Sequence, residues 1–282
     1  MPSARRLCDI AQMNNRFILA ALALSAILAR PVAAAPVQPT GKWVVDFAPS
    51  QCTAVRDYGT VDRPLALVLK PSVIGDVMTV AIVRGGASPA IGEHSVIIRL
   101  DQGPSFPASL LAFSPKSGKQ RVEMINLPLE TFSAVRRSTL LAIAGTGVAS
   151  RSFALSGMVP LMKAMDACLA DLQQLWNVSE VARAQLKQAP MSKKSLAKLF
   201  DSRDYPSGAL NSRQSGSLAF ALLIDETGKI ADCTVIATSG VATLDSQSCA
   251  VVKERAVFDP AVGSDGKPAK SAVIQRIRWE MP

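Results

Sequence analysis

The sequence predicts an α+β protein with an N-terminal antiparallel β-rich domain that ends in a helix, followed by a smaller C-terminal domain. Short apolar runs separated by Gly, Pro and Asp fill residues 42–153. The apolar spacing then changes to three and four residues over 158–176, and the last segment has the pattern of a hairpin, a helix and a strand. The composition supports a folded chain, because 49% of the 282 residues are hydrophobic.

The chain begins with the features of a secretory signal peptide. Residues 17–29 are apolar apart from Ser25 and follow a basic residue, and small residues occupy 32–35. Because a membrane-spanning helix needs roughly 17–25 apolar residues, this run is short for an anchor. We expect residues 1–35 to be a signal peptide that is cleaved near its end, with translation starting at Met1 or Met13. The alternative is a retained inner-membrane anchor, and only that would hold the protein at the membrane.

Export would change the charge and the cysteine content of the chain. Without residues 1–35 it keeps 27 basic and 21 acidic residues, a modest excess that suits solubility in an anionic cell envelope. Aromatic residues make up 5% of the sequence, so a stacking surface for nucleic acid is not expected. Four cysteines remain, and in an oxidising compartment they predict two disulfides with three possible connectivities.

Residues 36–176 are predicted to form the β-rich domain. The apolar runs expected to be strands are 43–47, 65–69, 77–83, 96–100, 110–113, 122–125, 140–143 and 152–155. Between 158 and 176 the apolar residues fall on one stripe of an amphipathic helix. Cys168 belongs to that stripe, and a bond to Cys52 near the first strand would fasten the helix to the sheet.

The C-terminal domain, residues 205–282, follows a polar and basic stretch over 177–204. We expect that stretch to be a solvated linker, because its apolar face is small for a helix on a membrane surface. The domain begins with a predicted strand over 217–225 and a returning strand over 230–239. Gly228 lies between them, where a hairpin turn needs a left-handed residue.

A helix and a last strand complete the C-terminal domain. Asp245 has the properties of a helix N-cap, and Pro260 disfavours helical geometry at the residue before it. The last strand spans 271–279, with Val273, Ile277 and Trp279 expected to point inward. The predicted result is a three-stranded antiparallel sheet packed on one helix.

These elements also predict the second disulfide. On the returning strand, Cys233 shares a face with Val235 and Ala237, and this face is expected to meet the helix. Cys249 lies on the helix face that is expected to meet the sheet. A Cys233–Cys249 bond would stabilise a small domain whose core is limited.

Short pieces of the C-terminal domain follow one another in a specific order. They are Tyr205-Pro206, Gly216, Asp225-Glu226-Thr227-Gly228-Lys229, Thr238-Ser239-Gly240, Leu244-Asp245, Phe258-Asp259-Pro260-Ala261, Asp265-Gly266-Lys267-Pro268 and the closing strand. In order and spacing these pieces resemble the TonB C-terminal domain family. The N-terminal domain has no comparable resemblance.

The resemblance implies a periplasmic adaptor that, in energy transducers, holds an extended segment of an outer-membrane receptor by adding it to a sheet edge. The edge residues in this sequence would be Val273, Ile274, Gln275, Arg276, Ile277 and Arg278. Energy transducers of this family also keep a membrane helix and a long Pro-rich spacer, whereas the 18 prolines here are scattered. We therefore expect an exported, non-enzymatic protein that binds an envelope protein or receptor peptide, with an anchored energy transducer as the alternative.

Catalytic, cofactor and metal sites are not predicted. The sequence has no G-x-S-x-G elbow, phosphate-binding glycine loop or H-E-x-x-H motif. The one histidine, His94, precedes a predicted strand without other catalytic groups around it, so we expect a surface residue. An envelope enzyme with its activity in the N-terminal domain remains the other alternative.

Overall fold

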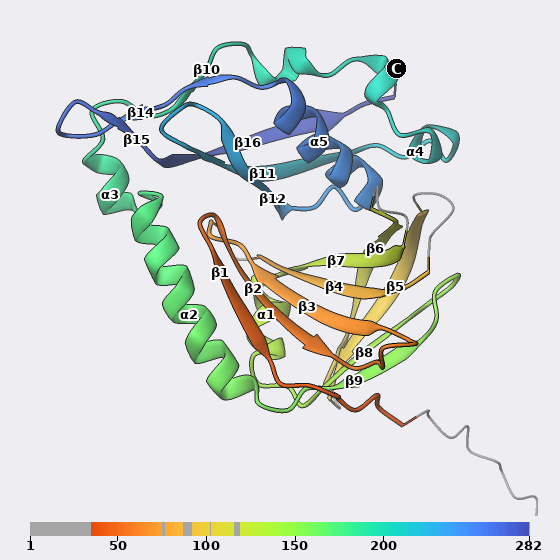
Figure 1. The fold of residues 1–282 in the computed structure, drawn as a ribbon. Coiled ribbons are helices and arrows are strands. Elements are labelled where there is room, and N and C mark those ends of the chain that lie inside the picture. The colour runs from red at the N-terminus through yellow and green to blue at the C-terminus, as the bar shows by residue number, and fades with distance from the viewer. Residues whose placement is uncertain (1–34, 75–76, 87–91, 102, 116–118, 282) are drawn as a thin grey trace, which may run out of the picture. The chain divides into compact units, whose positions relative to one another are not determined.

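The computed structural model describes residues 35–74, 77–86, 92–101, 103–115 and 119–281. The predicted signal peptide lies outside the described residues, apart from Ala35. The predicted α+β fold class is confirmed, with a curled nine-stranded antiparallel sheet and a long helix followed by a three-stranded sheet packed on a helix (Figure 1). Within the described ranges, no helix combines the length and the apolar character that crossing a membrane requires.

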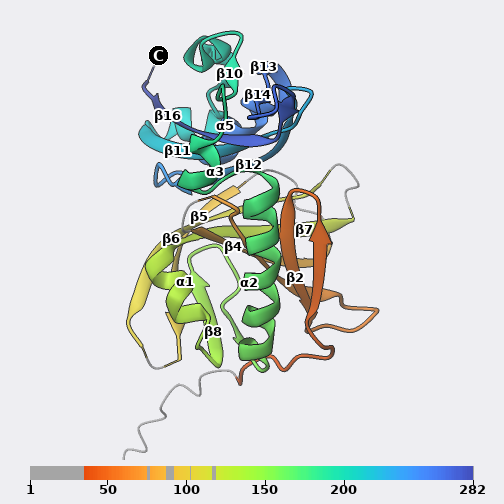
Figure 2. The ribbon, with the colours of Figure 1, turned by 90° about the vertical axis from the view of Figure 1, so that its left-hand side faces the viewer.

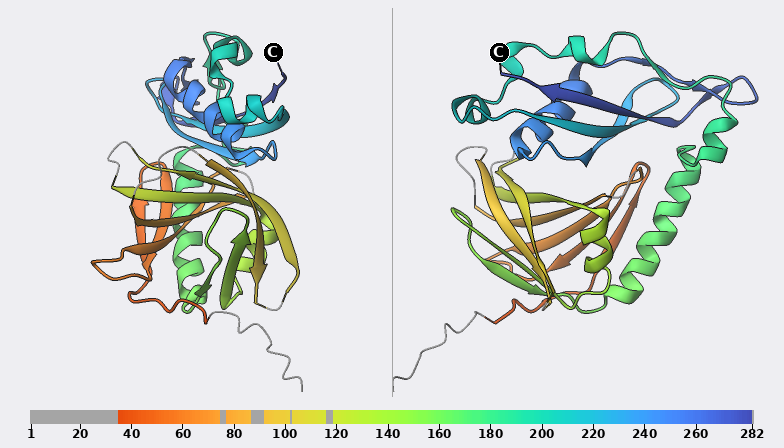
Figure 3. Two further views of the ribbon diagram at one scale, coloured as in Figure 1. Left: turned by 90° about the vertical axis from the view of Figure 1, so that its right-hand side faces the viewer. Right: turned by 180° about the vertical axis from the view of Figure 1, so that it is seen from behind.

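The N-terminal sheet has the strand order β1-β2-β3-β4-β7-β6-β5-β8-β9. The strands are β1 (Val44–Ala48), β2 (Gln51–Asp57), β3 (Leu65–Pro71), β4 (Val77–Gly85), β5 (Gly92–Leu100), β6 (Ser105–Phe113), β7 (Gln120–Pro128), β8 (Leu140–Gly145) and β9 (Arg151–Ala154). A short helix, α1 (Leu129–Val135), follows β7 and contacts β4 and β7. The sheet curls strongly, as the views from the side and from behind show (Figure 3). Strand β2 and helix α1 are elements that the sequence analysis does not predict.

Contacts between Tyr58, the residue after β2, and strand β9 hold the two ends of the curled sheet together. The Tyr58 hydroxyl donates to the Ala154 carbonyl at 2.8 Å, and the Tyr58 ring meets Phe153 edge-on with centroids 5.0 Å apart. The Tyr58 ring is thus buried while its hydroxyl group still has a hydrogen-bond partner. The inside of the curl is the core of the domain. Its largest fully buried side chains include Phe153, Leu67, Leu69, Met78, Ile82, Ile98, Leu110, Ile125 and Leu127.

Helix α2 (Met158–Leu175) packs along β1 and β2 (Figure 2). Its buried residues recur at spacings of three and four, as the sequence predicts, and they are Met158, Leu161, Met162, Met165, Cys168 and Leu172. A Cys52–Cys168 disulfide, with a Cα–Cα distance of 6.2 Å, joins the helix to β2. The cystine therefore lies in the contact between the helix and the sheet.

In the C-terminal domain, strand β11 (Gly216–Ile224) lies between β12 (Ile230–Ala237) and β16 (Ser271–Trp279). Helix α5 (Ala242–Arg255) packs on one face of this sheet. The remaining elements are α3 (Glu180–Ala184), β10 (Met191–Ser192), η1 (Leu196–Leu199), η2 (Ser202–Asp204), α4 (Ser207–Asn211), β13 (Phe258–Asp259), β14 (Ala261–Val262) and β15 (Pro268–Ala269).

Part of the stretch expected to be a linker packs on the C-terminal domain. Strand β10 pairs with β13, and Leu196 is buried in the core of this domain together with Phe220 and Val252. Two-residue strands and single buried residues do not produce a periodic hydrophobic pattern. The sequence of 177–204 therefore predicts a solvated linker, although part of it is packed. The division of the chain at residues 35, 176 and 204 stays a prediction.

Two local predictions for the C-terminal domain are wrong. The N-cap of α5 is Val241 and not Asp245, which lies in the first turn. The Asp245 carboxylate accepts hydrogen bonds from the Thr238 hydroxyl at 2.6 Å and from the Ser239 backbone N–H at 2.9 Å, so it closes the loop before the helix. Ala237 does not share the buried face of Val235, because a bulge shifts the β11–β12 register and leaves Ala237 exposed.

Polar contacts join the two domains. The Lys70 ammonium of β3 lies 3.2 Å from both carboxylate oxygens of Asp232 on β12. Glu93 of β5 accepts hydrogen bonds from the Thr243 backbone N–H at 3.2 Å and from the Thr243 hydroxyl at 3.1 Å. Val241 makes no side-chain cap at this end of α5. Glu93 therefore supplies, from the other domain, an acceptor that a helix N-terminus needs.

Replacing Glu93 with alanine is expected to lower the free energy of unfolding by about 1 kcal/mol, the usual effect of losing a helix cap. Chemical denaturation of the purified protein measures it. Glu254→Ala is the control, because this carboxylate is exposed in the last turn of the same helix and should change stability by less than about 0.5 kcal/mol. Equal effects of the two substitutions would contradict the capping role.

Candidate functional site

Strand β16 is a free edge of the C-terminal sheet. It pairs along its whole length with β11, from Ser271 opposite Ile224 to Trp279 opposite Gly216. In the part of the chain that the structure describes, it pairs with no other strand. An unpaired edge presents backbone N–H and C=O groups to which an extended peptide can bind.

The side chains of β16 alternate between the two faces of the sheet. Val273 and Ile277 pack in the core below α5, and Gln275 is half-buried. Ile274, Arg276 and Arg278 point to the other face and are exposed. A strand added at this edge would therefore meet one apolar side chain and two cationic ones.

The two arginines differ in their ionic partners. The Arg278 Nε atom lies 3.2 Å from a Glu280 carboxylate oxygen, but both side chains are more than 70% exposed, so this pair contributes little to stability. Arg276 has no ion-pair partner among the described residues. Both guanidinium groups can therefore bind an acidic group on a partner.

Trp279 fixes the end of the edge strand. Its indole N–H donates to the buried Ser248 hydroxyl of α5 at 2.9 Å. Its ring meets the rings of Phe200 and Tyr205 edge-on, with centroid distances of 5.3 Å in both pairs. The strand end is thus held between the helix and the segment that precedes the domain.

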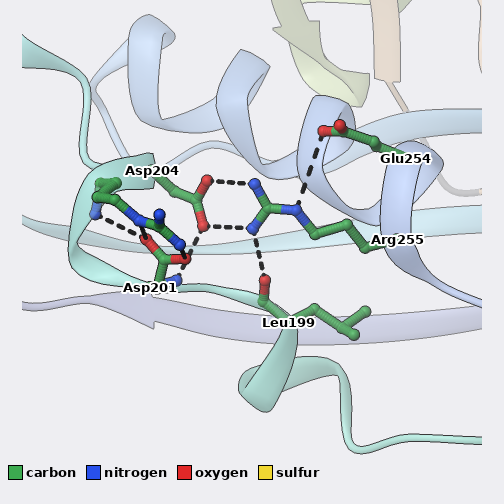
Figure 4. A network of polar contacts seen from close by, with 6 residues as sticks. Leu199, Asp201, Asp204, Glu254 and Arg255 are labelled. Carbon is green, nitrogen blue, oxygen red and sulfur yellow. Dashed lines mark hydrogen bonds and ion pairs between the residues drawn. The ribbon is translucent and has the colours of Figure 1, made fainter.

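A polar network around Arg255 holds that preceding segment against α5 (Figure 4). The guanidinium group donates to both carboxylate oxygens of Asp204 at 2.7 Å and to the Leu199 carbonyl at 2.8 Å. Hydrogen bonding from Arg255 keeps the pKa of the Asp204 carboxyl below its ordinary value, although burial opposes the shift. In the same turn, hydrogen bonds from Arg203 lower the pKa of Asp201 to about 2.

The second disulfide joins β12 to α5. Cys233 and Cys249 are bonded, with a Cα–Cα distance of 5.7 Å. The structure thus contains both cysteine pairs that the sequence predicts. One turn before Cys249 lies Asp245, which is 4% exposed. Burial raises the pKa of its carboxyl above the ordinary value, despite the hydrogen bonds from Thr238 and Ser239.

One buried polar cluster is not found by the sequence analysis. Glu123 of β7 is 2% exposed and accepts hydrogen bonds from Arg84 at 3.2 Å, Arg121 at 3.0 Å and Arg151 at 2.7 Å. Burial alone would raise the pKa of Glu123, but Arg151 and Arg84 outweigh it, so the pKa lies below the ordinary value. The signal in the sequence is a glutamate at an inward position two residues before Ile125.

Metal ligands do not converge in the described ranges. No group of three or more His, Cys, Asp or Glu side chains there is arranged to hold a metal ion. His94 lies half-buried on β5.

Comparison with known proteins agrees with the geometry of the C-terminal domain. Residues 201–281 match the family model described as the Gram-negative bacterial TonB protein C-terminal. No curated protein and no solved structure matches the chain. The matched range contains the hairpin, α5 and the edge strand β16. The N-terminal domain lies outside the range that the family model matches. Residues 201–281 of this chain are a TonB C-terminal domain.

Proposed function

We propose that this chain is an exported, non-enzymatic binding protein whose C-terminal domain holds an extended peptide of an envelope partner at the edge of β16. The observation that carries the proposal is the position of β16 as a free edge within a TonB C-terminal domain. The two cystines support a periplasmic location, because disulfides persist in oxidising compartments. The peptide adds as a further antiparallel or parallel strand, with main-chain hydrogen bonds supplying most of the affinity.

Charge gives the proposed edge its preference. Ile274 offers one apolar contact, and Arg276 and Arg278 lie two and four residues further along the same face. Exposed arginines act mainly on the association rate and on the choice of partner. We therefore propose an acidic, extended segment, such as the periplasmic end of an outer-membrane receptor, as the partner.

Binding to a panel of synthetic receptor peptides is the direct test. We expect an acidic peptide to bind the full chain, and Arg276→Glu with Arg278→Glu to weaken binding by about tenfold or more through reversed charge. The same peptide with alternate backbone N-methyl groups should lose most of its affinity, because it can no longer donate along the edge. Isothermal titration calorimetry measures both effects.

Lys194→Glu is the matched control, since this lysine is exposed and lies outside β16. It should leave the affinity within about twofold of the wild type. Binding that survives both the double arginine substitution and N-methylation would contradict strand addition at β16. N-terminal sequencing of the mature protein separates the exported form from an anchored energy transducer, because a chain that begins near residue 35 has no anchor.

A further inference from the structure

A cavity of about 830 Å³ lies between the two domains. Its floor is formed by the outer face of β5, β6 and β7, and its roof by β12 and the first turns of α5. The volume is within the range of small-molecule sites, about 300–1,000 Å³, and such sites occur preferentially at domain interfaces. Residues of β16 do not contribute to its wall, so the cavity is separate from the proposed peptide site.

Much of the cavity wall is apolar. Leu111 and Met124 are neighbours across the β6–β7 pair, and Val235 of β12 forms part of the roof. Ile97 also lines the cavity and is 45% exposed, although it is a large hydrophobic side chain. An apolar group that entered here would remove from water the exposed surface of Ile97 and Met124, and it would pack against Leu111 and Val235, which are already buried.

One hydrogen-bonding group in the wall is not satisfied within the protein. The Thr79 hydroxyl donates to the Oδ1 atom of Asn126 at 2.8 Å. The Nδ2 amino group of Asn126 has no hydrogen-bond partner in the described part of the chain. Since an amide has two donors on this nitrogen, Asn126 can donate to a ligand oxygen.

The charged side chains in the described wall are Lys70 and Asp245, and both are already compensated. Lys70 is paired with Asp232 from β12. Asp245 accepts its two hydrogen bonds from the loop before α5. A charged ligand would lose its hydration in the cavity without gaining a counter-ion.

We propose that this interdomain cavity binds an uncharged amphipathic small molecule, with its apolar part on Ile97, Leu111 and Met124 and a hydroxyl or carbonyl oxygen at Asn126. Such a molecule contacts the floor from one domain and the roof from the other. Its binding therefore stabilises the contact between the domains by mass action.

Three probes with the same eight-carbon chain test the proposal on the full chain. They are octyl β-glucoside, octyl sulfate and octylammonium, each used below the concentration at which it forms micelles. We expect octyl β-glucoside to bind saturably at one site, and the two ions to bind at least tenfold more weakly. Calorimetry gives the affinities, and NMR reports the Asn126 side-chain amide and the Ile97 methyl groups.

Two substitutions localise the binding. Ile97→Ala should weaken the binding of octyl β-glucoside by about tenfold, because an apolar contact is lost. Asn126→Ala should weaken it by about as much, because a hydrogen bond is lost. Val61→Ala is the control, because Val61 is 97% exposed and lies outside the cavity wall, and its affinity should equal that of the wild type. The proposal is overturned if octyl β-glucoside does not bind, if either ion binds as tightly, or if neither cavity substitution weakens binding.

Discussion

Replacing both Cys52 and Cys168 with alanine is expected to lower the free energy of unfolding by about 4–5 kcal/mol. The bond closes a loop with a sequence separation of 116 residues, and the entropy that a crosslink removes from the unfolded chain grows with the length of the loop. The bond also holds α2 on β2, where Cys52 and Cys168 are both buried. Chemical denaturation of the oxidised wild type and of the double variant measures the difference.

The second cystine provides the matched comparison. Cys233 and Cys249 close a loop with a separation of 16 residues, for which the same relation gives about 3 kcal/mol. We therefore expect the Cys233→Ala, Cys249→Ala protein to be the more stable of the two double variants. The reverse order would mean that loop length does not decide their contributions. Mass spectrometry before and after reduction verifies which bonds are present in each protein.

The C-terminal domain is the part of the fold that sequence predicts best, because its signals are local. Gly228 has a φ of 80° in the hairpin turn, a conformation that glycine adopts without strain. Strand β11 precedes this turn, and its apolar residues Leu218, Phe220 and Leu222 share one buried face. The prediction for Asp245 is wrong because its side chain closes the loop before α5, and the prediction for Ala237 is wrong because of a bulge. Neither feature produces a recognisable sequence pattern.

The elements missed in the N-terminal domain carry weaker patterns. Strand β2 turns Cys52, Ala54 and Arg56 inward, so it contains no apolar run. Arg56 is 9% exposed because its guanidinium group donates to the Gly41 carbonyl at 2.9 Å, a partner that the sequence does not reveal. Because charged residues are rarely buried without a partner, a segment with a charged residue at an inward position is predicted to be a loop when that partner is not known.

The hydrophobic periodicity of the sequence also does not predict the contact between the two domains. Strand β11 is buried on both faces, since Ala221 and Leu223 pack with the core of the N-terminal domain. The sequence shows this only as a continuous apolar run, which is equally typical of a strand covered by helices on both sides. The cavity between the domains depends on this contact, so only coordinates could reveal it. The edge of β16, in contrast, follows from strand order and could be predicted.

Replacing Glu123 with glutamine is expected to lower the free energy of unfolding by about 3 kcal/mol at neutral pH. The substitution keeps the size of the side chain and removes the negative charge that Arg84, Arg121 and Arg151 all contact. Removing one partner from a buried ion pair is costly because the remaining charges lose their counter-ion, and the side chains of Arg121 and Arg151 are only 17% exposed. Asp166→Asn is the control, because its pair with Arg136 is exposed and should contribute less than about 1 kcal/mol.

The pH dependence distinguishes lost charge from altered packing. Since the pKa of Glu123 is lowered in the folded protein, its contribution to stability is complete above the ordinary glutamate pKa of about 4.3. It is lost as the pH falls through the lower pKa of the folded state, because the unfolded chain binds the proton first. The stability difference between wild type and Glu123→Gln should therefore shrink below about pH 4. A difference that stayed constant between pH 7 and pH 3 would show that glutamine disturbs the packing of the curled sheet and that the charge itself contributes little.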